Sequence, residues 1–229
     1  MTIRKRTGSL LIATAATTAA VVGLCAAPAL ASSPRATTLT VKVSGGGKFT
    51  AKATKTVLTE VVSGVTVSVT CTSKGTTPAS SATGNIPSGT HKGISPVKVG
   101  TTTNLKFNNC SGPLGPVHTK VMAEPYKVSV DSKTNSKGQT DGIISGIKVH
   151  VTMTGCAFNV TGSAPGFYTN GKHTLTMTSK KLPVKPTTKA QLTISGVAAG
   201  TCAGIIKNGQ HPGFNSVFTL SRKGTIHSS

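Results

Sequence analysis

Apolar and polar residues alternate along much of this chain. Leu39, Val41 and Val43 are separated by single polar residues, and the pattern recurs at residues 65–71, 126–130, 147–153 and 175–177. A period of two residues is typical of strands with one buried and one solvated face, as in antiparallel sheets. Because no sustained helical stripe follows residue 31, we expect an all-β fold, an antiparallel sandwich or barrel.

The segments between these runs are rich in residues that favour turns. Residues 76–91 are rich in Ser, Thr, Gly and Pro and predict a surface loop, as do the Pro-containing residues 180–189. The polar residues 131–142 predict a connection between the two halves of the chain. The triplet Gly45-Gly46-Gly47 lies between two alternating stretches and predicts a hairpin turn.

The start of the chain predicts a secretory signal peptide over residues 1–31. Positive residues 4–6 precede the uncharged, apolar residues 10–24, a run shorter than the roughly 20 residues of a membrane span. Small residues at the positions that signal peptidases read predict cleavage between Ala31 and Ser32. We therefore expect a secreted, extracellular protein with no transmembrane segment after cleavage.

The cysteines indicate a cross-linked exported domain. Cys25 leaves with the predicted signal, and the mature chain keeps four cysteines: Cys71, Cys110, Cys156 and Cys202. An even number in an exported protein argues for two disulfides, which can be paired in three ways. A structural zinc site is disfavoured, because no C-x-x-C pair is present.

An internal duplication favours one of these pairings. Residues 63–70 resemble residues 145–152, and each run leads to a cysteine, Cys71 or Cys156. Each half then contains a Cys-x-Gly motif, at Cys110 or Cys202, and a closing strand that begins with an aromatic residue. If the halves are equivalent, Cys71 pairs with Cys110 and Cys156 pairs with Cys202. Each bridge would then stabilise the fold by about 4 kcal/mol through loop closure.

This duplication also sets the expected domain organisation. Residues 32–37 are expected to form a flexible start, and residues 38–229 the all-β domain, with pseudo-repeats at about 38–130 and 131–229. The repeats could share one core or form two domains. We favour one shared core, because about 85 aromatic-poor residues would make a thin core alone.

The charge balance favours anionic partners. The chain has 25 Lys and Arg against 4 Asp and Glu, and loss of the three basic residues at 4–6 lowers its net charge from +21 to +18. The lysines are scattered, with one loose cluster at Lys180, Lys181, Lys185 and Lys189. Because arginine forks are scarce, we expect an anionic envelope polymer or another polyanion rather than a specific nucleic acid.

No motif in the sequence predicts catalysis. The carboxylates are Glu60, Glu124, Asp131 and Asp141, and only Glu124 with Asp141 suggests a pair for hydrolysis. The six histidines are at 91, 118, 150, 173, 211 and 227, without metal-ligand spacing, and no G-x-S-x-G motif is present. We therefore expect no enzyme and no catalytic, metal or cofactor site.

Two features bear on identity and binding. The strand Val67–Cys71 with its V-x-V-x-C pattern, Cys110-Ser-Gly and Cys202-Ala-Gly together resemble a family of uncharacterised secreted actinobacterial β-proteins rich in Thr, Ser and Gly. This resemblance implies a cell type and no mechanism.

Four aromatic residues of the second half (Phe158, Phe167, Tyr168 and Phe214) could line a shallow ligand patch, although packing against their own loops is the commoner role.

Together these patterns predict a basic, secreted or envelope-associated β-protein that is not an enzyme and acts by binding or as a structural component. The alternatives are a β-barrel or sandwich that binds a small apolar ligand and, less favoured, a secreted hydrolase.

Overall fold

The computed structural model describes residues 37–180, 182–184 and 189–229. The predicted signal peptide, its cleavage site between Ala31 and Ser32 and residues 32–36 lie outside the described residues. Within these ranges the fold is all-β and antiparallel, as the alternation predicts. No helix in this part of the chain is long and apolar enough to cross a membrane.

The described residues contain sixteen strands and two short 3-10 turns. The first eight strands are β1 Thr38–Ser44, β2 Gly47–Ala53, β3 Lys55–Val62, β4 Val65–Thr72, β5 Ser80–Ile86, β6 Gly89–Ile94, β7 Val97–Phe107 and β8 Cys110–Gly112. The others are β9 Gly115–Val121, β10 Tyr126–Val130, β11 Gln139–Met153, β12 Cys156–Thr169, β13 Thr174–Met177, β14 Leu192–Ser195, β15 Gly213–Leu220 and β16 Thr225–Ser228. The 3-10 turns are η1 Asn170–Lys172 and η2 Cys202–Gly204.

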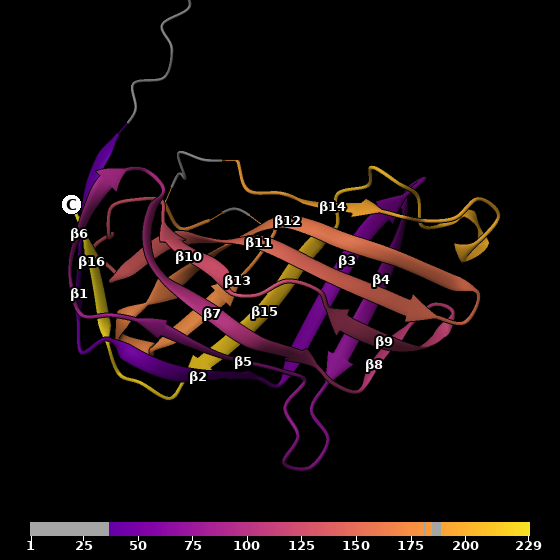
Figure 1. Cartoon of the computed structure of the whole chain (residues 1–229), viewed down its shortest axis with the longest axis horizontal. Coiled ribbons are helices and arrows are strands. Elements are labelled where there is room, and N and C mark those ends of the chain that lie inside the picture. The colour runs from indigo at the N-terminus through magenta and orange to yellow at the C-terminus, as the bar shows by residue number, and fades with distance from the viewer. Residues whose placement is uncertain (1–36, 181, 185–188) are drawn as a thin grey trace, which may run out of the picture. The chain divides into compact units, whose positions relative to one another are not determined.

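Eight of these strands close into a ring. Antiparallel pairing runs in the order β2, β5, β7, β10, β11, β12, β13 and β15, and β15 pairs back with β2. Closure gives each of these strands two hydrogen-bonded neighbours and leaves the ring without a free edge. Of the two architectures that the sequence left open, the chain therefore forms the barrel (Figure 1).

Three long strands extend beyond the ring into a second belt. Residues 149–152 of β11 pair with β9, residues 159–162 of β12 pair with β14, and residues 213–216 of β15 pair with β3. Strands β3, β4, β8 and β9 complete this belt by antiparallel pairing. Among the described strands, no pairing joins β14 to β3, so hydrogen bonding does not close the second belt at that point.

A small sheet of β16, β1 and β6 crosses the opposite end of the ring (Figure 1). The predicted alternation in β1 is confirmed, because Leu39, Val41 and Val43 are buried while Lys42 is exposed. These three side chains pack with Val97 and other residues of the ring in one apolar cluster. The small sheet therefore caps the barrel at this end.

The Gly45-Gly46-Gly47 triplet does not form the predicted hairpin. It leads from β1 in the small sheet to β2 in the ring, and these two strands do not pair with each other. Gly45 and Gly47 have φ values of +65° and +132°, and a Cβ on Gly46 would lie 2.3 Å from the carbonyl oxygen of Ile86. The glycines allow a tight connection between two sheets. The local sequence pattern of such a connection is the same as that of a hairpin turn.

The surface loop predicted over residues 76–91 is also wrong. Most of this segment forms β5 and the start of β6, and Ser80 and Ala82 are buried. Strands β2 and β7 supply hydrogen bonds to both edges of β5, and this overrides the turn preference of its Ser, Thr and Gly residues. The predicted connection over 131–142 is confirmed only for residues 131–138, because β11 begins at Gln139.

Residues from both predicted halves pack in one cluster of the core. Ala51, Val69 and Val117 of the first half share it with Val149 and Phe158 of the second. The two cysteine pairs lie in different settings: Cys71 and Cys110 face each other across β4 and β8, whereas Cys202 lies in η2. The internal duplication stays a prediction from the sequence.

Both predicted disulfides are confirmed. Cys71 is bonded to Cys110, and Cys156 is bonded to Cys202. The first bridge fastens β8 to β4 in the second belt, and the second ties the start of β12 to the loop after β14. The bridges close loops with sequence separations of 39 and 46 residues.

Replacement of Cys71 and Cys110 together by alanine should lower the free energy of unfolding by about 4 kcal/mol, because the unfolded chain regains the entropy of the open loop. Urea denaturation of the oxidised wild type and the double variant measures this difference. A loss below about 1 kcal/mol would show that the bridge does not constrain the unfolded chain as this model requires.

Candidate functional site

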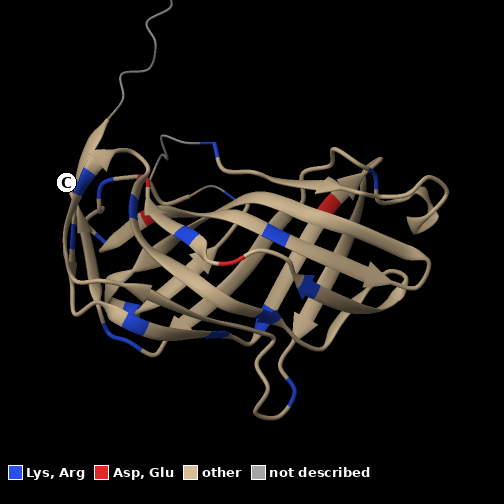
Figure 2. Cartoon of the chain, viewed as in Figure 1, with Lys and Arg blue, Asp and Glu red and all other residues tan. Residues whose placement is uncertain are grey.

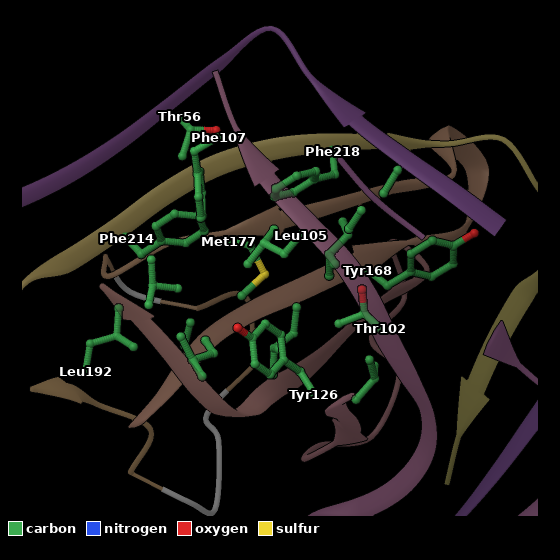
Figure 3. Close-up of a pocket in the computed structure, with 18 of the residues that line it drawn as sticks. Thr56, Thr102, Leu105, Phe107, Tyr126, Tyr168, Met177, Leu192, Phe214 and Phe218 are labelled. Carbon is green, nitrogen blue, oxygen red and sulfur yellow. The ribbon is translucent and has the colours of Figure 1, made fainter. Parts of the chain in front are cut away.

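An apolar cavity of about 150 Å³ lies inside the barrel. Strands of the ring and of the second belt both contribute side chains to its wall. Figure 3 shows Leu105, Met177 and Phe218 among the side chains that point into this space, with Tyr168 on one side and Leu192 on the other.

The aromatic residues of the chain are concentrated around this cavity. The chain has six Phe and two Tyr, and six of these eight line the cavity: Phe49, Phe107, Phe214, Phe218, Tyr126 and Tyr168. The rings of Phe107 and Phe214 meet edge to face, with centroids 6.1 Å apart. In a chain so poor in aromatic residues, their position makes the interior surface hydrophobic and rigid.

Several hydroxyl groups on the wall are engaged with the protein itself. Thr56 Oγ1 shares hydrogen bonds with the hydroxyls of Ser80 and Ser216, and Thr102 Oγ1 donates to the carbonyl of Thr83. The Tyr126 hydroxyl donates to the carbonyl of Lys148 at 3.3 Å. These groups offer a ligand little free hydrogen-bonding capacity, so the wall presents mainly hydrocarbon.

The tyrosine hydroxyls stay protonated well above neutral pH. The Tyr168 hydroxyl donates to the carbonyl of Gly224 at 2.6 Å. Burial raises the pKa of both Tyr126 and Tyr168; for Tyr126 the hydrogen bond to Lys148 opposes this shift and Glu124 adds to it. The cavity wall therefore carries no ionised tyrosine at physiological pH.

The cavity arises from small side chains inside a wide ring. Ala51, Ala82 and Ala164 are nearly fully buried and line it, on β2, β5 and β12. An eight-stranded barrel has an interior just wide enough to be filled by side chains or to hold one small ligand. Because alanines occupy inward positions, this barrel has room for one small ligand.

The shallow patch predicted from four aromatic residues is only partly correct. Tyr168 and Phe214 do line a ligand-sized space, but it lies inside the barrel rather than on loops. Phe158 is 1% exposed and packs in the core, and Phe167 does not line the cavity. Sequence reasoning missed Phe107 and Met177, although both stand on alternating runs whose inward face the pattern could have indicated.

Glu124 and Asp141, the pair considered for hydrolysis, bind different groups. The Glu124 carboxylate is exposed and accepts the backbone N–H groups of Asn104 and Leu105, both at 2.8 Å. Asp141 is fully buried and accepts the N–H of Val184 at 3.0 Å. Glu124 thus ties the segment before β10 to residues 104 and 105 of β7.

Two other carboxylates come together instead. Asp131 and Asp141 are both 0% exposed and lie opposite each other where β10 and β11 end their pairing, with the Asp131 N–H donating to the Asp141 carbonyl. The Ser95 hydroxyl donates to Asp131 Oδ1, and the Ser132 hydroxyl accepts the N–H of Asp141. Both aspartates are thus buried, within the segment 131–142 that the sequence predicts to be a connection.

Burial raises the pKa of Asp141 to about 6, above its ordinary value of 3.8. The hydrogen bond from Val184 opposes this shift, and the nearby Asp131 carboxylate adds to it. Within the part of the chain that the structure describes, the buried Asp141 Oδ1 atom has no hydrogen-bond partner. This carboxyl group is therefore easier to protonate in the folded protein than in the unfolded chain.

The histidines and cysteines form no cluster of metal ligands in the described residues, where no three His, Cys, Asp or Glu side chains are grouped to hold an ion. His150 Nδ1 lies 2.8 Å from the Asn159 side-chain oxygen, and His211 Nδ1 lies 3.0 Å from the carbonyl of Leu192. Both rings thus have partners within the protein.

Lysine and arginine residues are spread over many strands and loops of the chain (Figure 2). Every lysine that the structure describes is exposed, as is Arg222. The loose cluster is only partly described: Lys180 and Lys189 are exposed, and Lys181 and Lys185 lie outside the described residues. The basic residues form a diffuse positive surface.

Comparison of the chain with models of protein families, with curated proteins and with solved structures finds no match.

Replacement of Asp141 by asparagine tests the buried carboxyl group. Because the pKa is higher in the folded protein, the wild type should lose stability as pH rises from about 4 to 6 and level off above that range. Asparagine does not titrate and keeps an acceptor for Val184, so Asp141→Asn should be more stable than the wild type at pH 7, by on the order of 2 kcal/mol.

Urea denaturation of both proteins between pH 4 and pH 8 measures this difference. Parallel curves for the two proteins over the whole range would contradict the raised pKa.

Proposed function

We propose that this protein is a secreted, non-enzymatic binding protein that holds a small apolar molecule inside its barrel. The observation that carries the proposal is the interior cavity, with its aromatic wall and its internally satisfied hydroxyl groups. Apolar surface buried against such a wall drives binding, and its hydroxyls give polar ligands few partners.

The size of the cavity supports a ligand role over imperfect packing. Protein interiors are close-packed, and an empty cavity costs about 24 cal/mol per Å³. At about 150 Å³ the void would cost roughly 4 kcal/mol, a large part of the stability of a single domain. An apolar cavity of this size stays dry and accepts a benzene-sized molecule. Occupancy by an apolar guest would offset the cost.

The exposed lysines favour a second, compatible role. A diffuse positive surface attracts anionic polymers such as those of a cell envelope, without the arginine forks that specific phosphate recognition uses. Such attraction would keep an exported binding protein close to the cell. The two disulfides suit an oxidising, extracellular setting.

Toluene should bind the purified protein saturably and raise its melting temperature, because it fills the apolar void. Ala164→Leu adds three carbons to the wall and should weaken toluene binding about tenfold or more. Val217→Leu is the matched control, since Val217 is 54% exposed on β15, and should bind as the wild type does. Calorimetric titration measures all three proteins.

The wild-type titration alone decides the proposal if Ala164→Leu fails to fold. Absence of saturable toluene binding to the wild type, or equal binding by a folded Ala164→Leu, would overturn it.

The surface role predicts binding to polyglutamate that weakens by about tenfold between 50 mM and 300 mM sodium chloride, because exposed charges are screened within a Debye length. Sedimentation of the complex at increasing salt measures this. If the protein does not bind polyglutamate at 50 mM salt, the positive surface has no part in its function.

A further inference from the structure

A depression of about 350 Å³ lies where strand pairing leaves the second belt open. β15 pairs with β3 only as far as Thr59, so the edge of β3 from Glu60 onward has no strand beside it on that side. Residues 190–192 and 211–214 also line the depression. Leu192 and Phe214 line both this depression and the interior cavity, and they lie on the same side of the cavity in Figure 3.

Glu60 is the one acidic side chain among the described residues that line this depression. Thr56 and Leu58 on β3 line the interior cavity, and Glu60 follows them with the same two-residue spacing, which places it on the inward face of the strand. Its Oε2 atom is buried and has no hydrogen-bond partner among the described residues. A carboxylate oxygen in this state gains most from a donor brought by another molecule.

The rest of the described lining adds no lysine or arginine, although every described lysine is exposed elsewhere. His211 lines it too, and its Nδ1 lies 3.0 Å from the carbonyl of Leu192. The same nitrogen lies 3.4 Å from the Thr193 hydroxyl, so His211 is held by contacts within the protein.

We propose that this depression is the mouth of the cavity and binds the cationic head group of the ligand. An amine on an apolar chain would place its ring or chain in the cavity, pass between Leu192 and Phe214, and donate to the carboxylate of Glu60. This inference rests on the proposed function and narrows it to apolar amines, in a protein whose outer surface repels cations. A charge-assisted hydrogen bond at a partly buried carboxylate supplies the selectivity.

Three probes with the same apolar part test the site: butylbenzene, 4-phenylbutylamine and 4-phenylbutyrate. The wild type should bind the amine about tenfold more tightly than butylbenzene and bind the carboxylate most weakly. Glu60→Gln should bind butylbenzene as the wild type does and lose the tenfold preference for the amine. Glu124→Gln removes the same charge at an exposed carboxylate that does not line the depression, and should keep the preference.

Calorimetric titration at pH 7 separates the outcomes. Binding of butylbenzene with no preference for the amine, or a preference that survives in Glu60→Gln, overturns the head-group site and leaves the apolar cavity intact. If Glu124→Gln loses the preference for the amine as fully as Glu60→Gln does, the preference comes from the net charge of the protein. That result also overturns the site. Failure of all three probes to bind the wild type overturns the proposed function itself.

Discussion

Closure of eight antiparallel strands into a ring is the constraint on which the rest of this structure depends. Once β15 pairs back with β2, every inward side chain of the ring faces the same enclosed space. The number of strands fixes the width of that space, and the side chains decide how much of it is filled. With alanines on β2, β5 and β12 and aromatic rings between them, part of the interior stays empty.

Elements outside the ring determine how that interior meets the solvent. The small sheet of β16, β1 and β6 packs its valines and Leu39 over one end. At the other end the second belt is fastened by two disulfides but not closed by strand pairing, and Leu192 and Phe214 stand between the cavity and the depression there. Glu60 Oε2, which is buried and has no hydrogen-bond partner in the described ranges, lies at this same place.

Local patterns in the sequence predicted the strands with clean alternation, such as β1 and β11, and the apparent internal duplication predicted both bridges. They failed at residues 76–91, where neighbours in space, not local preference, make β5 a strand. Tyr168 and Phe214 were identified as ligand candidates, but their meeting with Phe107 and Met177 depends on ring closure. Closure joins segments far apart in the chain, so no local pattern reports it.

Methyl-resolved NMR tests the central claim, that the interior of the ring admits an apolar guest, most directly. On titration with toluene, the methyl resonances of Ala164 and Met177 inside the cavity should shift saturably, while those of the exposed Val217 should not. Shifts confined to exposed methyl groups, or none at all with toluene in excess, would contradict the account and identify the cavity as imperfect packing.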